Sequence, residues 1–118
     1  FRPRDGSGLS ASGALTPENM TNLLTTMATD PAFADFRASI PVVGESGTVK
    51  NLARGTVAAG RVRAKSGSIE GVRAYAGYVT TRSGETLTFS VMVNKYTEGQ
   101  SRALTRAFEQ LFVILADL

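Results

Sequence analysis

The chain contains neither cysteine nor histidine among its 118 residues. Without cysteine it cannot form a disulfide framework or a thiolate metal site. Without histidine it lacks the side chain that most often serves proteins as a general base and as a metal ligand. Catalysis by residues of this chain is therefore restricted to lysine, serine, tyrosine and carboxylate side chains, and we expect no metal ion and no cofactor.

Long apolar runs and blocks of like charge are also missing. No apolar run approaches the roughly 20 residues that a membrane-spanning helix needs, so we expect no membrane span. The 13 basic and 10 acidic residues are scattered along the chain, which argues against nucleic-acid binding. The chain is 42% apolar and 19% charged, as is usual for a folded protein, and its length allows at most one domain.

Three segments have the apolar spacing of amphipathic helices. Thr16 and Pro17 form a helix start, with threonine as N-cap and proline at the first helical position, and the stripe that follows predicts a helix over 16–29. We expect a short second helix over 31–39 and a long one over 99–118, whose apolar face is broad enough to pack against a sheet. The apolar positions of the first helix are Met20, Leu23, Leu24 and Met27.

The second half of the chain alternates apolar and polar residues as strands do. Residues 82–84 indicate a hairpin turn between two of the strands, and residues 44–60 a loop with one helical turn near 50–54. Together these elements predict an α+β fold in which helices cover an antiparallel sheet of three strands. The predicted strands span residues 61–65, 72–81 and 85–93.

The segment Lys65-Ser66-Gly67-Ser68 begins where the predicted first strand ends. The lysine offers a positive charge, the Ser66 hydroxyl can donate a hydrogen bond, and the glycine lets a ligand approach the backbone closely. Two interpretations are open: a strand that runs into a turn with a solvated lysine, or one wall of a site that binds a carboxylate. Residue types alone favour the solvated lysine, whereas the surrounding sequence favours the site.

Three segments of the chain resemble segments of a known enzyme family, and they follow one another in the order found in that family. Residues 59–78 read A-G-R-V-R-A-K-S-G-S-I-E-G-V-R-A-Y-A-G-Y, residues 5–10 read D-G-S-G-L-S, and residues 41–50 read P-V-V-G-E-S-G-T-V-K. They resemble the D-Ala-D-Ala carboxypeptidases of the low-molecular-mass class C penicillin-binding proteins, which are serine peptidases. The resemblance covers essentially the whole chain. It implies that residues 1–118 form a single partial domain, the C-terminal portion of a penicillin-binding, β-lactamase-like transpeptidase fold.

The resemblance also implies an acyl-serine mechanism, with K-S-G in the place of the K-T-G motif of penicillin-binding proteins. Lys65, Ser66 and Gly67 would bind the terminal carboxylate of the substrate, and Lys65 would support proton transfer. The backbone N–H of Ser68 would be one of two donors to the oxyanion. The implied catalytic residues are Lys65 and Ser68, and the implied substrate-binding residues are Lys65, Ser66, Gly67 and Ser68.

The sequence departs from the family in two respects. Ser66 replaces the commoner threonine but keeps the hydroxyl, so we expect little change in function. The S-x-x-K motif, which holds the family's nucleophilic serine, and the S-x-N motif are both absent from the chain. In the family both precede the D-G-S-G-L-S segment, so we expect this chain to be the C-terminal part of a longer enzyme and to be inactive alone. Its sheet would then lack neighbours, and we expect it to pair with the missing N-terminal part or to self-associate.

The family resemblance implies an enzyme that acts on peptidoglycan peptides ending in D-Ala-D-Ala. It further implies β-lactams as inhibitors and a periplasmic or cell-envelope location, with which the lack of cysteine is compatible. Two alternatives stay open. One is a non-catalytic fragment or binding module with the same fold, and the other is a serine β-lactamase or esterase, which the D-G-S-G-L-S segment disfavours.

Several other polar residues have structural interpretations. We interpret Asp5 as a turn residue that caps backbone N–H groups, and Arg61 and Arg63 as solvated charges on a strand face. Tyr75 and Tyr78 are three residues apart on one predicted strand. Because side chains alternate along a strand, we expect the two rings on opposite faces of the sheet.

Overall fold

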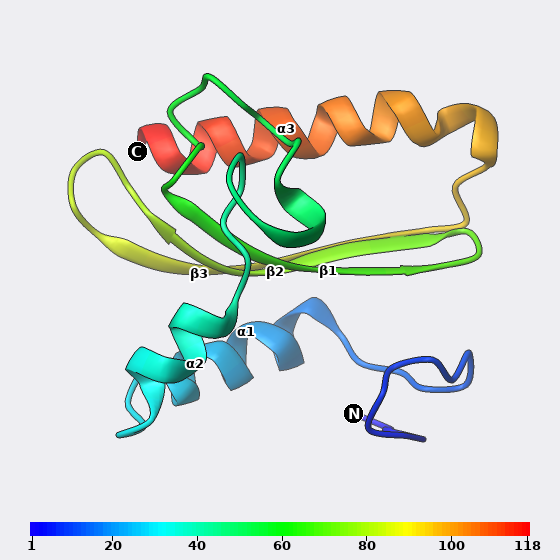
Figure 1. Ribbon diagram of the computed structural model, residues 1–118. Helices are drawn as coiled ribbons and strands as arrows, with labels where there is room; N and C mark the ends of the chain where they lie inside the picture. Colours follow the sequence, from blue (N-terminus) through cyan, green and yellow to red (C-terminus); the bar gives the residue numbers. More distant parts are fainter.

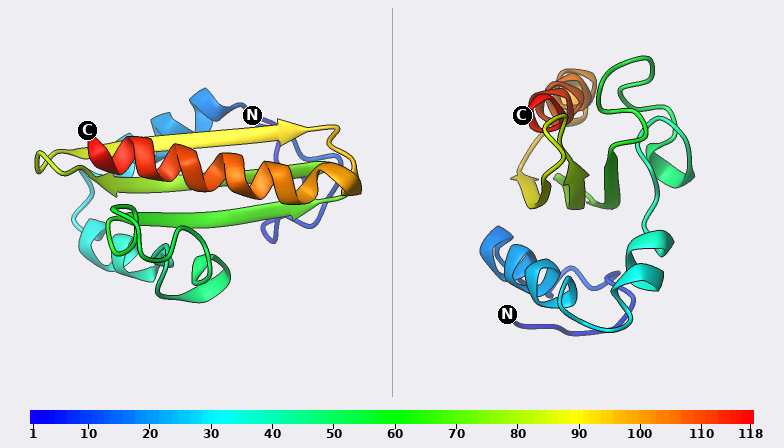
Figure 2. Two further views of the ribbon diagram at one scale, coloured as in Figure 1. Left: turned by 90° about the horizontal axis from the view of Figure 1, so that it is seen from above. Right: turned by 90° about the vertical axis from the view of Figure 1, so that its left-hand side faces the viewer.

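A three-stranded antiparallel sheet separates two helical layers in the computed structural model, which describes residues 1–118 (Figure 1). The elements are α1 (Pro17–Met27), α2 (Phe33–Ser39), the 3₁₀ turn η1 (Gly47–Val49), β1 (Val62–Ile69), β2 (Val72–Thr80), β3 (Thr86–Asn94), the 3₁₀ turn η2 (Glu98–Gln100) and α3 (Ser101–Asp117). Figure 2 shows α3 over one face of the sheet, and α1 with α2 on the side of the other face. No helix combines the length and the apolar character needed to cross a membrane.

The first strand is longer than its sequence predicts. The predicted strand ended at Lys65, whereas β1 continues to Ile69, which faces Val72 across the hairpin. Serine and glycine give little local strand signal, so the continuation follows from pairing with β2. Gly71 closes the hairpin with a φ of +68°, which glycine adopts without strain. The interpretation in which the strand runs into a turn at this point is therefore wrong, and Lys65-Ser66-Gly67-Ser68 lies inside a paired strand.

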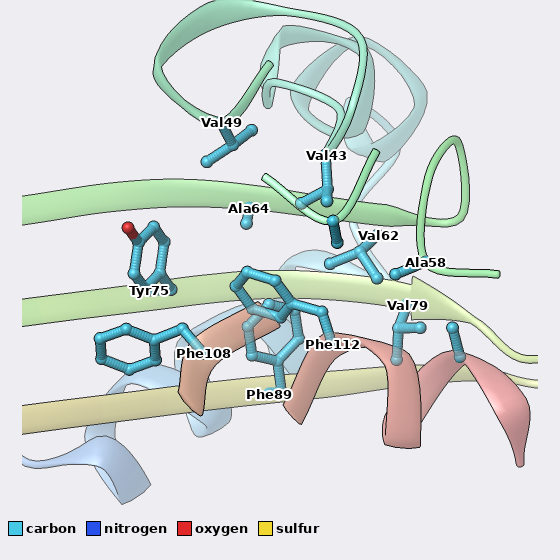
Figure 3. Close-up of a cluster of buried hydrophobic side chains, with 12 residues drawn as sticks. Val43, Val49, Ala58, Val62, Ala64, Tyr75, Val79, Phe89, Phe108 and Phe112 are labelled. Atoms are coloured by element: carbon cyan, nitrogen blue, oxygen red, sulfur yellow. The ribbon is translucent and has the colours of Figure 1, made fainter. Parts of the chain in front are cut away.

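The main hydrophobic core lies between the sheet and α3 (Figure 3). Tyr75 of β2 packs edge-on against Phe108 and Phe112 of α3, with ring centroids 4.8 and 5.5 Å apart. Phe89 of β3 meets Phe112 at 5.8 Å. Such edge-to-face pairs add about 0.5–1.5 kcal/mol each beyond the area they bury, so they help to hold α3 on the sheet. The apolar side chains that alternate along β3 also pack on this core: Leu87, Phe89, Val91 and Val93.

A smaller cluster on the opposite face joins the sheet to α1 and α2. Tyr78 of β2 is buried, and its hydroxyl donates a hydrogen bond of 2.7 Å to the Leu24 carbonyl of α1. The Phe33 ring at the start of α2 meets the Tyr78 ring edge-on at 5.2 Å. Tyr75 and Tyr78 thus lie on opposite faces, as their spacing predicts, and burial raises the pKa of both phenols.

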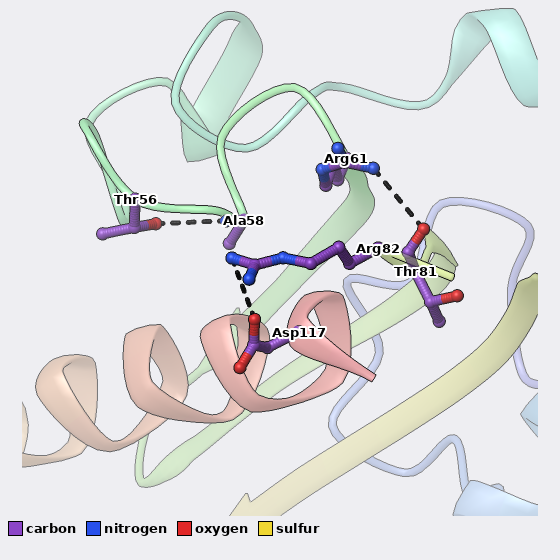
Figure 4. Close-up of polar contacts among 6 residues, drawn as sticks. All are labelled: Thr56, Ala58, Arg61, Thr81, Arg82 and Asp117. Atoms are coloured by element: carbon purple, nitrogen blue, oxygen red, sulfur yellow. Dashed lines mark hydrogen bonds and ion pairs between the residues drawn. The ribbon is translucent and has the colours of Figure 1, made fainter. Parts of the chain in front are cut away.

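The start of α1 has a local cap, whereas the end of α3 depends on a tertiary contact. The Thr16 hydroxyl accepts a hydrogen bond from the Asn19 N–H, and the Asn19 side chain accepts one from the Thr16 N–H, which together form a capping box. At the end of α3, the Arg82 N–H donates to the Ala116 carbonyl at 2.8 Å. The Arg82 guanidinium also pairs with Asp117 at 3.0 Å (Figure 4). The β2–β3 turn therefore satisfies a carbonyl that the helix end leaves free.

The segment between α2 and β1 contains one helical turn, but not at the predicted position. The turn is η1, whereas the prediction placed it near residues 50–54. Ala53 has a φ of +48°, a left-handed conformation that a right-handed helix cannot include. The Glu109 carboxylate of α3 accepts a hydrogen bond of 3.1 Å from the Ala53 N–H. A contact with a residue far along the chain therefore supports this conformation.

Arg63 is not the solvated residue that the sequence predicts. It is half-buried, and its guanidinium donates to the carbonyls of Arg37 at 3.3 Å and Ile40 at 3.1 Å. These carbonyls lie at the C-terminal end of α2, where a positive charge is favourable. Arg61, by contrast, is exposed as predicted and makes one long contact of 3.4 Å to the Thr81 carbonyl (Figure 4).

Replacement of Arg63 therefore should destabilise the protein more than replacement of Arg61. Arg63→Met keeps the aliphatic stem but removes two hydrogen bonds from a cation, and interactions of this kind contribute about 1.5–3 kcal/mol each. We expect a loss of about that size from the free energy of unfolding, measured by urea denaturation. Arg61→Met is the matched control and should change it by no more than about 0.5 kcal/mol. Equal losses for the two variants would contradict the role of Arg63 at the end of α2.

Candidate functional site

β1 is an edge strand, and only its first half is covered on the outer side. There, Val43 donates its N–H to the Val62 carbonyl at 2.8 Å, and Ala64 donates its N–H to the Pro41 carbonyl at 2.9 Å. No strand or bridge pairs with the outer edge beyond this point. The open part of the edge therefore begins where the K-S-G-S sequence begins.

The backbone of this open edge directs N–H groups away from the sheet. In an antiparallel ladder, successive residues point their N–H and C=O groups alternately to the two sides of the strand. Because the Ala64 N–H points outward, those of Ser66 and Ser68 also point outward, while Lys65 and Gly67 bond to β2. Ser68 is exposed, so its N–H is accessible to an acceptor on a ligand that lies along the edge.

Lys65, Ser66 and Gly67 border a cavity of about 430 Å³ between the sheet and α1. The walls are mostly apolar side chains from α1, α2 and β2, and Lys65 is the one charged residue among them. Lys65 is exposed, and its ammonium donates a hydrogen bond of 2.6 Å to the Ser66 carbonyl. An apolar cavity with one charged group beside it has the usual composition of a ligand site.

Nothing within the chain requires glycine at position 67. Gly67 does not have a positive φ, and a Cβ placed on it would meet the Cβ of Ala74 at 3.9 Å, an ordinary contact. Glycine in a strand is less favourable than alanine by roughly 0.5–1 kcal/mol. Its effect here is to leave the strand surface beside Lys65 open.

Ser66 lies on the other side of the strand from Lys65, because successive side chains alternate. Its hydroxyl oxygen is 2.7 Å from that of Thr48 in η1. The structure therefore groups Lys65 with Gly67 on the cavity side, and Ser66 with Ser68 on the side of Thr48. We did not single out Thr48 from the sequence, although it belongs to one of the three segments that carry the family resemblance.

Together the open edge offers one cation, two serine hydroxyls and two outward N–H groups. These groups are positive or can donate hydrogen bonds, and donors of this kind bind anionic acceptors most strongly. No group of three or more acidic side chains lies close enough together to hold a metal ion. The chemistry of the edge therefore suits a carboxylate or a developing oxyanion.

The Asp5 loop is organised by hydrogen bonds within itself. The Asp5 carboxylate accepts hydrogen bonds from the Ser7 hydroxyl at 2.7 Å, the Gly8 N–H at 3.1 Å and the Ser10 N–H at 3.2 Å. These bonds, the one from Ser7 above all, hold the pKa of the carboxyl group below its ordinary value. The interpretation of Asp5 as a turn-capping residue is therefore confirmed.

Comparison with known proteins identifies the family. The model of the D-Ala-D-Ala carboxypeptidase 3 (S13) family matches residues 1–115. The chain belongs to this family. This match confirms the family that the K-S-G-S, D-G-S-G-L-S and G-T-V-K segments indicate.

Two members of the D-Ala-D-Ala carboxypeptidase family illustrate the relationship. The D-alanyl-D-alanine carboxypeptidase of Actinomadura sp. (strain R39) is 42% identical over 98 residues, which cover 79% of this chain and 18% of the relative. The D-alanyl-D-alanine carboxypeptidase DacB of Haemophilus influenzae is 30% identical over 105 residues, which cover 86% of this chain and 22% of the relative. The chain thus spans about a fifth of the length of these relatives.

The fold agrees with a solved structure of the same family. The crystal structure of penicillin binding protein 4 (dacB) from Haemophilus influenzae matches with a TM-score of 0.82 and 28% identity, over 97% of this chain and 27% of that protein. A structure of the same protein complexed with a novel β-lactam matches equally well. The prediction of an α+β fold of the penicillin-binding transpeptidase type is confirmed.

Proposed function

We propose that this chain is the C-terminal part of a serine-type D-Ala-D-Ala carboxypeptidase or endopeptidase that acts on peptidoglycan stem peptides. Family membership supports the reaction class, and the coverage of about a fifth of each relative supports a longer parent enzyme. The observation that carries the proposal is the open edge of β1, where Lys65 and the outward N–H of Ser68 lie within one short stretch.

In the proposed reaction, the substrate peptide lies along the open edge of β1. The Lys65 ammonium and the Ser66 hydroxyl bind the carboxylate of the terminal D-Ala. A serine from another part of the enzyme gives its proton to a neighbouring base, which later passes it to the leaving amine, and attacks the peptide carbonyl. The N–H of Ser68 donates to the oxygen that becomes negative. The C–N bond then breaks, the leaving amine takes a proton, and D-Ala departs. Water hydrolyses the acyl-serine ester and restores the nucleophile.

β-Lactams can inhibit the proposed enzyme by binding at the same site. A β-lactam carries a carboxylate and a reactive carbonyl, so it can use the cation and the N–H donor that the peptide uses. The complex of penicillin binding protein 4 with a β-lactam supports this extension. Because peptidoglycan lies outside the cytoplasm, we also propose a periplasmic or cell-envelope location.

The free edge of β3 supports the proposal that another polypeptide segment completes the sheet. β3 pairs with β2 on one side, and no strand of this chain pairs with it on the other. An unpaired edge presents a row of N–H and C=O groups that can bond to another strand. The missing N-terminal part of the enzyme is the partner we propose, and self-association is the alternative.

A non-catalytic module with this fold is the second candidate, because the chain has neither an S-x-x-K nor an S-x-N motif. A serine β-lactamase or esterase is the third. Hydrolysis of a D-Ala-D-Ala peptide and of a β-lactam by the longer protein distinguishes the three. Turnover of the peptide with slow release of the β-lactam supports the carboxypeptidase, rapid β-lactam turnover supports the β-lactamase, and no reaction with either supports the module.

The isolated chain of 118 residues should not be acylated by penicillin. It lacks a serine in the nucleophile motif, and loss of a covalent nucleophile removes the mechanism as a whole. A fluorescent penicillin followed by a denaturing gel measures this, and we expect no labelled band for the chain alone. The longer protein that contains it is the positive control and should be labelled. A labelled band for the isolated chain would overturn the assignment of the nucleophile to another part of the enzyme.

A further inference from the structure

The hydroxyl groups of Thr48 and Ser66 form an isolated pair beside the open edge of β1. Their oxygens are 2.7 Å apart, and neither hydroxyl makes another hydrogen bond within the chain. The two residues are 18 positions apart in the sequence. Thr48 is exposed and Ser66 half-buried, so the pair is not part of the hydrophobic core.

The loop that carries Thr48 is held firmly against β1. Its first residues bond to the strand through the Val43 N–H and the Pro41 carbonyl. Gly47 lies so close to Pro41 that a Cβ on it would be 2.8 Å from the proline ring, and the side chain of Val49 is fully buried in the main core. Contacts on both sides of Thr48 therefore set the position of its hydroxyl relative to Ser66.

We propose that Thr48 is a positioning residue for Ser66. In this arrangement the Thr48 hydroxyl donates to the Ser66 oxygen, so the Ser66 proton stays free to point at the substrate carboxylate. Each hydroxyl has a single proton to donate, and a hydroxyl that accepts one hydrogen bond is a stronger donor in the next. This inference rests on the proposed role of Ser66 in carboxylate binding and adds the residue that directs it.

The geometry assigns the positioning of the Ser66 hydroxyl to Thr48, because Lys65 does not contact that hydroxyl. Lys65 lies on the opposite side of the strand, and its ammonium donates to the Ser66 carbonyl, not to the hydroxyl. The Ser66 hydroxyl therefore has one partner in the chain, which is Thr48. Without that partner the hydroxyl rotates among three staggered positions, of which one serves the carboxylate.

Thr48→Val and Thr48→Ser in the longer enzyme test the inference. Valine has the shape of threonine without the hydroxyl, and serine keeps the hydroxyl. Acylation rates are measured with an N-acyl-D-Ala-D-Ala peptide and with its C-terminal amide, which lacks the carboxylate. We expect Thr48→Val to lower the acid-over-amide preference roughly three- to tenfold, the effect of one neutral hydrogen bond, and Thr48→Ser to retain it. An unchanged preference in Thr48→Val, or an equal loss with both substrates, would overturn the inference.

Two further measurements separate this inference from the proposed function. In a Ser66→Ala background Thr48→Val should have no additional effect, because the group it directs is gone; an additional loss would count against Thr48 acting through Ser66. If the longer enzyme is not acylated by any substrate, the proposed function fails. The Thr48 inference is then decided by titration with N-acetyl-D-alanine. Amide signals of Ser66 and Ser68 should shift in the parent and not in Thr48→Val, and any other result overturns it.

Discussion

Lys65→Ala in the longer enzyme is expected to lower the acylation rate by about 10²–10³, the usual effect of losing one preorganised electrostatic donor. The proposed site loses the one charged residue that this chain places at the cavity. The fold should be unaffected, since the side chain is exposed and surface changes of this kind usually stay within about 0.5 kcal/mol. The measurements are acylation by a β-lactam and by a D-Ala-D-Ala peptide, together with thermal unfolding.

The chain provides a matched control and a graded series for Lys65. Lys95 is also an exposed lysine beside a strand end, and Lys95→Ala should leave acylation unchanged. Ser66→Ala should be milder than Lys65→Ala, because it removes one neutral hydrogen bond of roughly 0.5–1.5 kcal/mol. Ser66→Thr should be nearly silent. Acylation of Lys65→Ala at the parental rate, or a loss explained by unfolding, would return Lys65 to the interpretation of a solvated strand residue.

Gly77→Ala is expected to destabilise the protein severely. A Cβ on Gly77 would overlap the Arg63 carbonyl oxygen and lie 3.2 Å from the Ala64 Cα. Both contacts are backbone atoms of β1, so no side-chain rotation relieves them. The two strands would have to separate beside the buried residues of the core. We expect a loss of about 3 kcal/mol or more from the free energy of unfolding, at or above the upper end of overpacking effects.

Gly67→Ala is the matched control, because the same substitution in β1 meets only ordinary contacts. Urea denaturation should show little change or a small gain in stability for Gly67→Ala, since alanine is the better strand residue. Acylation should nevertheless fall, because the new methyl group stands beside Lys65 at the cavity. Similar stabilities for Gly77→Ala and the parent would contradict the close approach of β1 and β2 at this point.

Local sequence signals predicted the helices and two of the three strands well. Thr16 and Pro17 start α1 as predicted, because an N-cap and a proline at the first position act on the nearest turn alone. The alternation in β3 placed its apolar side chains on one face, because the period of a strand depends only on its own backbone.

The candidate site residues were also predicted from the sequence, through its resemblance to a family. The sequence predicts that Lys65-Ser66-Gly67-Ser68 forms one wall of a site that binds a carboxylate, and the structure places these residues on the open edge of β1. The orientation of these residues could not be predicted from the sequence. That the N–H of Ser68 points outward follows from the pairing of Ala64 with Pro41, which is a contact between segments separated by more than twenty residues.

The sequence alone therefore determined the start of α1, the faces of the strands and the family to which the chain belongs, because these depend on neighbours within a few residues or on the order of motifs along the chain. Tertiary structure alone decided that β1 continues to Ile69, that Arg63 caps α2 and that Thr48 meets Ser66. Each of these depends on which distant segment packs alongside. A residue's own preferences cannot specify such a partner, because the energy of the contact exists only once both segments are in place.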